Sequence, residues 1–268
     1  MAENINNIEN NNVENGVWYL DYTAHNPTSI PDGVNTVNLF VSGLDGQLEG
    51  FTPESLRAFV NACHAKGIHV KMSIGGQGGK YDKCWDELNG QNTSQIAKRL
   101  IDFCNNYKLD GIDFDYEENQ EGGTLQQEQY VGQLIKSFKD QAPDLTASLC
   151  TPAGDFWQSA AKAILDQTKD SSGASVIDHL YMMSYAGTTQ QVESWADHWD
   201  SFLDQYKLPP SAVTIGIAEN HGPGYDPDEI AKYAASKGYS TMIWNYNPTT
   251  PDSSNAFAKE IHDDYYGK

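Results

Sequence analysis

The sequence alternates apolar and acidic side chains over nine residues, Leu109-Asp110-Gly111-Ile112-Asp113-Phe114-Asp115-Tyr116-Glu117. Successive side chains of a β-strand point to opposite faces. The stretch therefore predicts a strand whose apolar face packs against helices and whose acidic face, Asp113, Asp115 and Glu117, points into the interior of a closed sheet. Asp110 has the opposite parity, and we expect it to be a structural hydrogen-bonding residue at the start of the strand.

Seven further apolar, β-branched runs occur along the chain, and longer helical patterns separate most of them. The eight predicted strands are 16–22, 36–42, 69–76, 109–117, 145–151, 177–185, 212–219 and 240–246. The predicted helices are 53–66, 91–107, 125–141, 156–169, 190–206, 227–237 and 253–265. Strands that alternate with helices indicate an α/β protein with a parallel sheet, and eight such units fit a (β/α)8 TIM barrel. A doubly wound open sheet is the rival fold, but the first strand is not followed by G-x-G-x-x-G.

Composition excludes several classes of partner. The 268 residues carry 37 acidic and 17 basic side chains, a formal net charge of −20, and only two of the basic residues are arginine. A nucleic-acid-binding protein needs a basic surface to neutralise phosphates, and an anionic membrane surface would repel this chain. No apolar run is long enough to span a membrane.

The ends of the chain and its cysteines give weaker signals. Residues 1–15 are rich in asparagine and predict a flexible arm before a single domain, 16–268. They lack the pattern of a signal peptide, so we leave the compartment open: secreted if a leader was removed, otherwise cytoplasmic. Four cysteines form no C-x-x-C pair and are interpreted as buried thiols, with one or two disulfides as the alternative: Cys63, Cys84, Cys104 and Cys150.

The three inward carboxyls are electrostatically costly. Residues two apart on a strand lie about 6.6 Å apart, and like charges at that range push pKa values apart. We expect at least one carboxyl to hold a proton near neutral pH, and Glu117, at the open end, is the natural proton donor to a leaving group. A core ion network or a metal held by Asp113 and Asp115 is the alternative, although the spacing of a calcium loop is absent.

The nine-residue stretch resembles the D-x-x-D-x-D-x-E signature of family 18 glycoside hydrolases, the chitinases and endo-β-N-acetylglucosaminidases. Three other elements are similar to those of the family: Ser73-Ile74-Gly75-Gly76 resembles S-x-G-G, Met183-Ser184-Tyr185 resembles M-x-Y, and Trp244 resembles the tryptophan under the cleaved sugar. They lie on the third, sixth and eighth predicted strands. The resemblance therefore extends from about residue 16 to the end.

The resemblance implies a substrate-assisted mechanism, an exception to the scheme with two catalytic carboxylates. Glu117 would protonate the glycosidic oxygen, and the substrate's own 2-acetamido carbonyl would attack C1 with retention of configuration. Asp115 would orient the acetamide N–H and stabilise the positive charge, Asp113 would share a proton with Asp115, and Tyr185 would hydrogen-bond the acetamide oxygen. No cofactor and no metal are expected.

Strand ends and aromatic residues suggest further substrate contacts, because sugars stack on flat aromatic faces. The candidates are Trp244, Tyr22, Phe40, Gly75, Gly76, Met183, Glu219, Asn245, Trp85 and Trp157. One departure from the family is Ala186, where many members have Asp or Asn; Asn245 or Glu219 could supply the missing contact. The twenty residues 220–239 leave no room for the small α+β insertion that some members carry, so we expect a shallow open groove.

These features favour a retaining endo-chitinase that hydrolyses β-1,4-linked N-acetylglucosamine polymers. The alternatives are an endo-β-N-acetylglucosaminidase acting on the N-glycan core, and a non-catalytic chitinase-like lectin. All four family site residues are present, which argues against the lectin. The expected partner is chitin or a chito-oligosaccharide, with no nucleic acid or membrane, and the protein is expected to be a monomer.

Overall fold

The structure is a computed structural model. It describes residues 13–19, 30–48, 50–77, 81, 83–117, 123–185, 187–218, 222–246 and 254–266. Its centre is a closed barrel in which eight strands pair in chain order, all parallel, and the last pairs with the first. The strands are β1 (Asn15–Tyr19), β2 (Thr36–Ser42), β3 (His69–Gly75), β4 (Gly111–Asp115), β5 (Thr146–Pro152), β6 (His179–Met183), β7 (Val213–Ile217) and β8 (Ser240–Tyr246).

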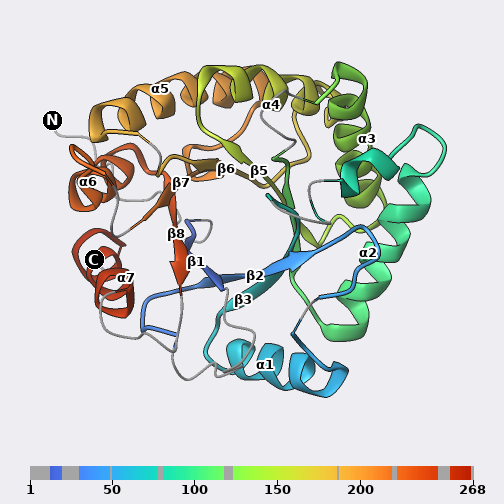
Figure 1. Ribbon diagram of the computed structural model, residues 1–268, viewed down its shortest axis with the longest axis horizontal. Helices are drawn as coiled ribbons and strands as arrows, with labels where there is room; N and C mark the ends of the chain where they lie inside the picture. The colour runs from blue at the N-terminus through green and yellow to red at the C-terminus, as the bar shows by residue number, and fades with distance from the viewer. Residues whose placement is uncertain are drawn as a thin grey trace, which may run out of the picture.

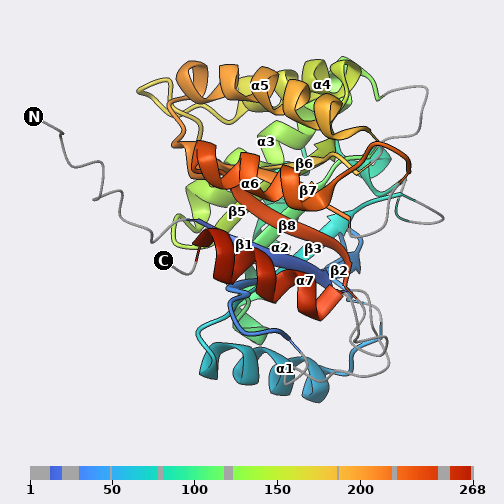
Figure 2. The ribbon, with the colours of Figure 1, turned by 90° about the vertical axis from the view of Figure 1, so that its left-hand side faces the viewer.

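Helices surround this barrel, as the view along its axis shows (Figure 1). Within the described residues they are α1 (Pro53–Ala65), α2 (Thr93–Tyr107), α3 (Leu125–Gln141), α4 (Asp155–Gln167), α5 (Thr189–Tyr206), α6 (Pro227–Lys237) and α7 (Ser254–Ile261). Shorter helical turns occupy Cys84–Glu87, Pro210–Ala212 and His262–Tyr266. From the side, α6 and α7 lie in front of β8 and β1 (Figure 2). The expected (β/α)8 barrel is confirmed, and α6 is the one helix among the described residues between β7 and β8.

Local sequence explains where helices begin. Thr52 accepts a hydrogen bond from the backbone N–H of Ser55, whose side chain reaches back to the Thr52 backbone. This reciprocal pair satisfies two of the N–H groups that a helix start leaves unbonded. At the start of α6, the side chain of Asp226 accepts from the backbone of Asp228 and Glu229. Both helices have proline at their first position, where the missing N–H costs nothing.

The two faces of each strand serve different layers. Outward side chains such as Ile112, Phe114 and Leu149 are fully buried in the layer between barrel and helices. Burying each such side chain stabilises the fold by about 1.5–3 kcal/mol. The interior of the barrel is far more polar than the branched apolar layers usual in this fold. Lys71 and Asp113 are 1% and 0% exposed there. The carboxylate row therefore faces inward, as the alternation predicts.

The cysteines are free and buried, in agreement with the interpretation as thiols. Burial raises the pKa of the Cys63 thiol to about 12. In the part of the chain that the structure describes, no helix is both long and apolar enough to cross a membrane.

Candidate active site

The carboxyl of Asp113 lies at the centre of a buried hydrogen-bond cluster. Ser148 donates to its Oδ1 at 2.8 Å, Ser73 donates to its Oδ2 at 2.9 Å, and Trp18 Nε1 lies 3.4 Å from Oδ2. Burial raises the pKa of Asp113 to about 6, although Lys71 and these three donors act in the opposite direction. Asp113 is therefore fixed in place by β1, β3 and β5, and it can carry a negative charge at neutral pH.

Asp115, one step nearer the carboxyl end of β4, has a different environment. It is 2% exposed, and its Oδ1 has no hydrogen-bond partner among the described residues. Burial and the charges of Glu117 and Asp113 raise its pKa well above the ordinary value, whereas a hydrogen bond with Cys150 lowers it. This direction agrees with the expectation that at least one carboxyl of the row holds a proton near neutral pH. Asp115 thus presents a buried oxygen that a substrate N–H could pair with.

Glu117 and Tyr185 lie at the barrel mouth, each just beyond its strand and each half-buried. Burial raises the pKa of Tyr185 well above its usual range, and the nearby Cys150, Glu117 and Asp115 add to the shift. The phenol of Tyr185 therefore stays protonated at neutral pH and can donate a hydrogen bond. The charge of Glu117 acts on the pKa of both Asp115 and Tyr185, and all three residues lie at the carboxyl ends of their strands.

Aromatic rings form one wall of this space. Trp244 on β8 stacks on Tyr185, with ring centroids 5.6 Å apart and an angle of 11° between the planes. It meets Phe40 and Trp18 edge to face, at 5.6 and 5.8 Å. Trp244 remains half-buried rather than enclosed, so part of its surface is available to a ligand. Met183 is 8% exposed and packs in the same inner cluster.

Two glycines allow the end of β3 to approach β4. Gly75 and Gly76 have φ of +96° and +86°, a region that L side chains rarely adopt. A Cβ on Gly75 would lie 2.2 Å from the carbonyl oxygen of Asp115, and one on Gly76 would lie 3.1 Å from Asp115 Oδ2 and 2.9 Å from Phe40 Cζ. The S-x-G-G motif therefore makes room for the carboxylate itself.

We expect Gly76→Ala to destabilise the fold by about 1–3 kcal/mol, from the strained backbone, and also to lower kcat by displacing Asp115. Gly67→Ala is the matched control, since Gly67 has φ of +74° and no atom of the described residues lies within 4 Å of its added Cβ. Thermal unfolding should show a loss for both variants, and hydrolysis should fall only for Gly76→Ala. Equal activity in the two variants would contradict this account.

The expectation that Trp85 stacks on sugar is wrong. Trp85 is 0% exposed and belongs to the outer core, where its ring meets Tyr116 edge to face at 5.9 Å. Its indole fills the space beneath Gly75, where an added Cβ would lie 2.6 Å from the ring. Trp157 is half-buried, and its ring contacts Tyr116 and Phe156, so its role as a sugar platform stays a prediction.

Three predicted contacts cannot be placed. Tyr22 and Glu219 lie outside the described residues, and so does Ala186, the departure from the family pattern. Asn245 belongs to β8, but the structure describes only its backbone. The structural role expected for Asp110 is confirmed, because its Oδ2 accepts from the Val70 backbone at 2.6 Å and lies 2.8 Å from His64 Nε2.

Sequence reasoning missed several neighbours of the carboxylates, namely Trp18, Ser148, Cys150 and Lys71. Each lies on the inward face of its strand, so alternation along β1, β3 and β5 could have identified them. The strongest of these signals is Lys71, a lysine inside the otherwise largely apolar strand His69–Gly75, because a charged residue there indicates a buried polar contact. In the described ranges, no three His, Cys, Asp or Glu side chains are grouped as a metal site would require.

Comparison with known proteins identifies the family of this chain. Residues 20–250 match the family described as the endo-beta-N-acetylglucosaminidase EndoS TIM-barrel domain. The chain belongs to this family of glycoside hydrolases. The match confirms the resemblance to family 18 glycoside hydrolases that the sequence motifs indicate.

Relatives of this family 18 barrel carry chitinase names. Endochitinase 2 of Metarhizium anisopliae is 22% identical over 249 residues, which cover 84% of this chain and 56% of that protein. A chitinase-like effector of Moniliophthora perniciosa is 39% identical over 70 residues, 26% of this chain and 16% of the relative. The chain thus spans about half or less of the length of these relatives.

Solved structures support the same fold. A GH18 chitinase from Pseudoalteromonas aurantia superposes with a TM-score of 0.70 at 20% identity, covering 92% of this chain and 98% of the other. A GH18 chitinase from Cycas revoluta, solved with (GlcNAc)3, gives 0.67 at 14% identity and covers 92% and 98%.

Proposed function

We propose that the protein is a retaining endo-chitinase that hydrolyses β-1,4-linked N-acetylglucosamine by substrate-assisted catalysis. One observation carries the proposal: Asp115 Oδ1 is buried and has no partner among the described residues, while both oxygens of the adjacent Asp113 accept hydrogen bonds. An unpaired buried acceptor costs about 1–3 kcal/mol. The N–H of a 2-acetamido group would satisfy it. The (GlcNAc)3 complex of the Cycas revoluta chitinase supports this choice of substrate class.

The reaction divides into two balanced steps. In the first, Glu117 gives its proton to the glycosidic oxygen, the C1–O bond breaks, and the acetamido carbonyl oxygen bonds to C1 as an oxazolinium ion. The leaving sugar departs with the proton. In the second, Glu117 takes a proton from water, the hydroxide bonds to C1, and the acetamide is regenerated. Two inversions at C1 retain the configuration.

The site residues divide the remaining work. The negative charge of the Asp113–Asp115 pair stabilises the positive charge of the oxazolinium ion. Asp115 accepts a hydrogen bond from the N–H of that ion. Tyr185, kept protonated by its surroundings, donates to the acetamide oxygen and aims it at C1. An internal nucleophile held this way has an effective molarity of about 10⁵–10⁸ M in well-oriented cases. Trp244 provides the surface on which the cleaved sugar rests.

We expect soluble chitin oligosaccharides to be cleaved, and glucosamine oligomers without acetyl groups to resist cleavage, because they lack the internal nucleophile. The measurement is product analysis by mass, with NMR of the first anomer released, which should be β. Rapid cleavage of the deacetylated oligomer would overturn the mechanism. Initial release of the α anomer would contradict retention.

The second candidate is an endo-β-N-acetylglucosaminidase that cuts the N-glycan core, which the EndoS description of the family favours. A high-mannose glycoprotein belongs in the same incubation. Cleavage of the glycoprotein but not of chitin oligosaccharides would decide for this alternative. A wild-type protein that binds the oligosaccharides in calorimetry and cleaves none of the substrates would instead be a lectin.

A further inference from the structure

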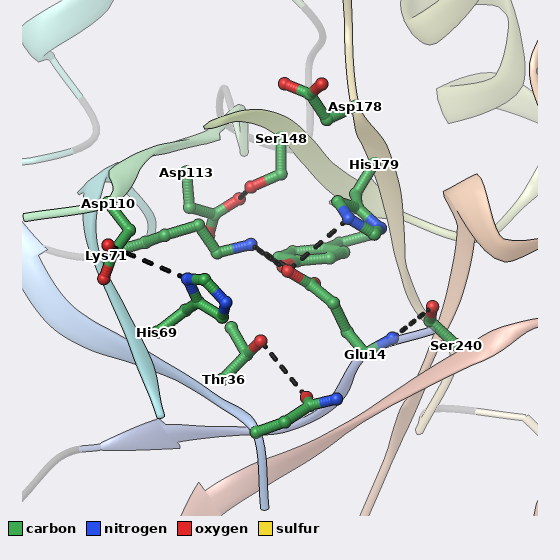
Figure 3. Close-up of polar contacts among 12 residues, drawn as sticks. Glu14, Thr36, His69, Lys71, Asp110, Asp113, Ser148, Asp178, His179 and Ser240 are labelled. Atoms are coloured by element: carbon green, nitrogen blue, oxygen red, sulfur yellow. Dashed lines mark hydrogen bonds and ion pairs between the residues drawn. The ribbon is translucent and has the colours of Figure 1, made fainter. Parts of the chain in front are cut away.

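A group of charged side chains lies inside the barrel on the side away from its mouth. Lys71 Nζ on β3 lies 2.9 Å from Oε1 of Glu14, the residue before β1. The same ammonium donates to the hydroxyl of Tyr181 on β6 and lies 4.6 Å from the centroid of its ring. Lys71 is 1% exposed and Glu14 is 9% exposed. Figure 3 shows Lys71 and Glu14 converging in this space, with Asp113 and Ser148 beside them.

This group is joined to the carboxylate row. Tyr181, which accepts from Lys71, donates to Glu14 Oε2, and the charge of Asp113 acts on its pKa. Ser148, on the neighbouring strand β5, donates to Asp113 Oδ1 at 2.8 Å. Along β3, Lys71 precedes Ser73, the other hydroxyl that donates to Asp113. The positive charge of Lys71 therefore lies one layer below Asp113, and it acts on the pKa of Asp113 in the downward direction.

Packing alone gives no reason for an ion pair at this place. The interior of a TIM barrel is usually filled by layers of branched apolar side chains. Replacing a buried ion pair by apolar residues of similar volume is often neutral or stabilising. Although burial opposes ionisation of Glu14, His179 and Lys71 lower its pKa to about 2. Glu14 is therefore charged at neutral pH, and it offsets part of the charge of Lys71.

We propose that Lys71 is a positioning residue for catalysis: it holds Asp113 ionised, so that the Asp113–Asp115 pair keeps a single proton, and Glu14 limits how strongly the ammonium acts. The inference rests on the proposed hydrolysis, in which this pair must be negative to oppose the oxazolinium ion. Lys71 touches no reacting atom and acts only through Asp113.

The titratable and charged groups that act on Lys71 or Asp113 come from β3, β4, β5, β6 and the residue before β1: His69, Asp115, Cys150, His179, Tyr181 and Glu14. Glu117, beyond β4, acts on Asp115. Burial lowers the pKa of His179 and raises that of Tyr181. Both are therefore neutral at neutral pH. Lys71 and Glu14 are therefore the charged members of this buried group, and substituting each one singly tests its effect on Asp113.

The sign of each change follows from these charges. Below the pKa of Asp113 the pair holds two protons and carries no charge, so kcat/KM should rise as the pH passes upward through this pKa. Lys71→Met removes the attractive cation and so raises the pKa of Asp113. The acidic limb of the pH profile, where kcat/KM rises with pH, should therefore move to higher pH by about one unit. Glu14→Gln removes the charge that offsets Lys71 and should move the same limb to lower pH.

The experiment compares the pH profiles of kcat/KM for wild type, Lys71→Met, Glu14→Gln and the double variant on a chitin oligosaccharide. Both single variants should lose stability, because each leaves a buried charge unpaired. The double variant is uncharged at this place, and its acidic limb should lie between those of the two single variants. If the Lys71–Glu14 pair has only a structural role, the variants should lose stability but keep the acidic limb of the pH profile at the wild-type position. Shifts in the same direction for both single variants, or no shift, would overturn the proposal.

A second measurement is independent of turnover. Titration of ¹³C-labelled aspartate carboxyls by NMR, with Asp113→Asn to assign the signal, should show the pKa of Asp113 raised in Lys71→Met and lowered in Glu14→Gln. If Lys71→Met does not fold, the direction of the Glu14→Gln shift decides. A wild type without hydrolytic activity would overturn the proposed function, and the titration would still decide the role of Lys71.

Discussion

Replacing Glu117 by glutamine is expected to lower kcat on chitin oligosaccharides by about 10²–10⁴-fold, the usual contribution of a general acid. Glutamine has nearly the same shape but cannot give up a proton, so KM should change little. Steady-state kinetics on a chitin tetrasaccharide measures both constants. Undiminished kcat would refute the assignment of Glu117 as the acid.

A substrate with a better leaving group makes this test sharper. An aryl glycoside of N-acetylglucosamine with an acidic phenol departs without needing protonation. The loss of kcat in Glu117→Gln should therefore be much smaller for the first step of this substrate than for a sugar leaving group. An equal loss on both substrates would mean that Glu117 acts by another route than proton donation.

Asp115→Asn is expected to lower kcat by about 10²–10³-fold, as loss of a preorganised electrostatic group usually does. The amide still fits the space beside Gly76 and Cys150, but it cannot share a proton with Asp113 or oppose a positive charge. On the aryl glycoside, Asp115→Asn should lose as much kcat as on the oligosaccharide, unlike Glu117→Gln. The reason is that the oxazolinium ion forms whichever group leaves.

The control for Asp115→Asn is a change elsewhere on the same strand. Asp110→Asn alters a carboxyl that bonds Val70 and His64 at the start of β4, remote from the mouth. It should lower thermal stability and leave kcat nearly unchanged. A large fall in kcat for Asp110→Asn, or none for Asp115→Asn, would contradict the roles assigned to the two ends of the strand.

Much of this architecture could be predicted because it depends on local patterns. Alternation along β4 identifies the inward carboxylates, and helix starts such as Thr52 and Asp226 follow from capping chemistry. The predicted strand 109–117 is longer than the observed Gly111–Asp115. Alternation continues beyond the paired residues at both ends, and Asp110 and Glu117 take other roles there.

The rest depends on contacts between residues far apart in the chain. Lys71 meets Glu14 and Tyr181 across 57 and 110 residues, a pairing that no local pattern specifies. Trp85 was misjudged for a similar reason. It follows a glycine-rich segment that suggests an exposed loop, whereas its indole fills a hole beside Tyr116 that exists only once β3 and β4 are in register.

The pairing of β1 with β8, which closes the barrel, has a consequence for biosynthesis. We call this junction the seam. The backbone N–H of Thr241 donates to the carbonyl of Glu14, and Trp18 meets Trp244 across the same seam. Two walls of the site therefore come from opposite ends of the barrel sequence. A growing chain that still lacks β8 has Glu117, Asp113 and Asp115 but neither Trp244 nor a closed barrel. If the proposed hydrolysis is correct, a chain released before the eighth strand is made should show no hydrolysis of chitin oligosaccharides.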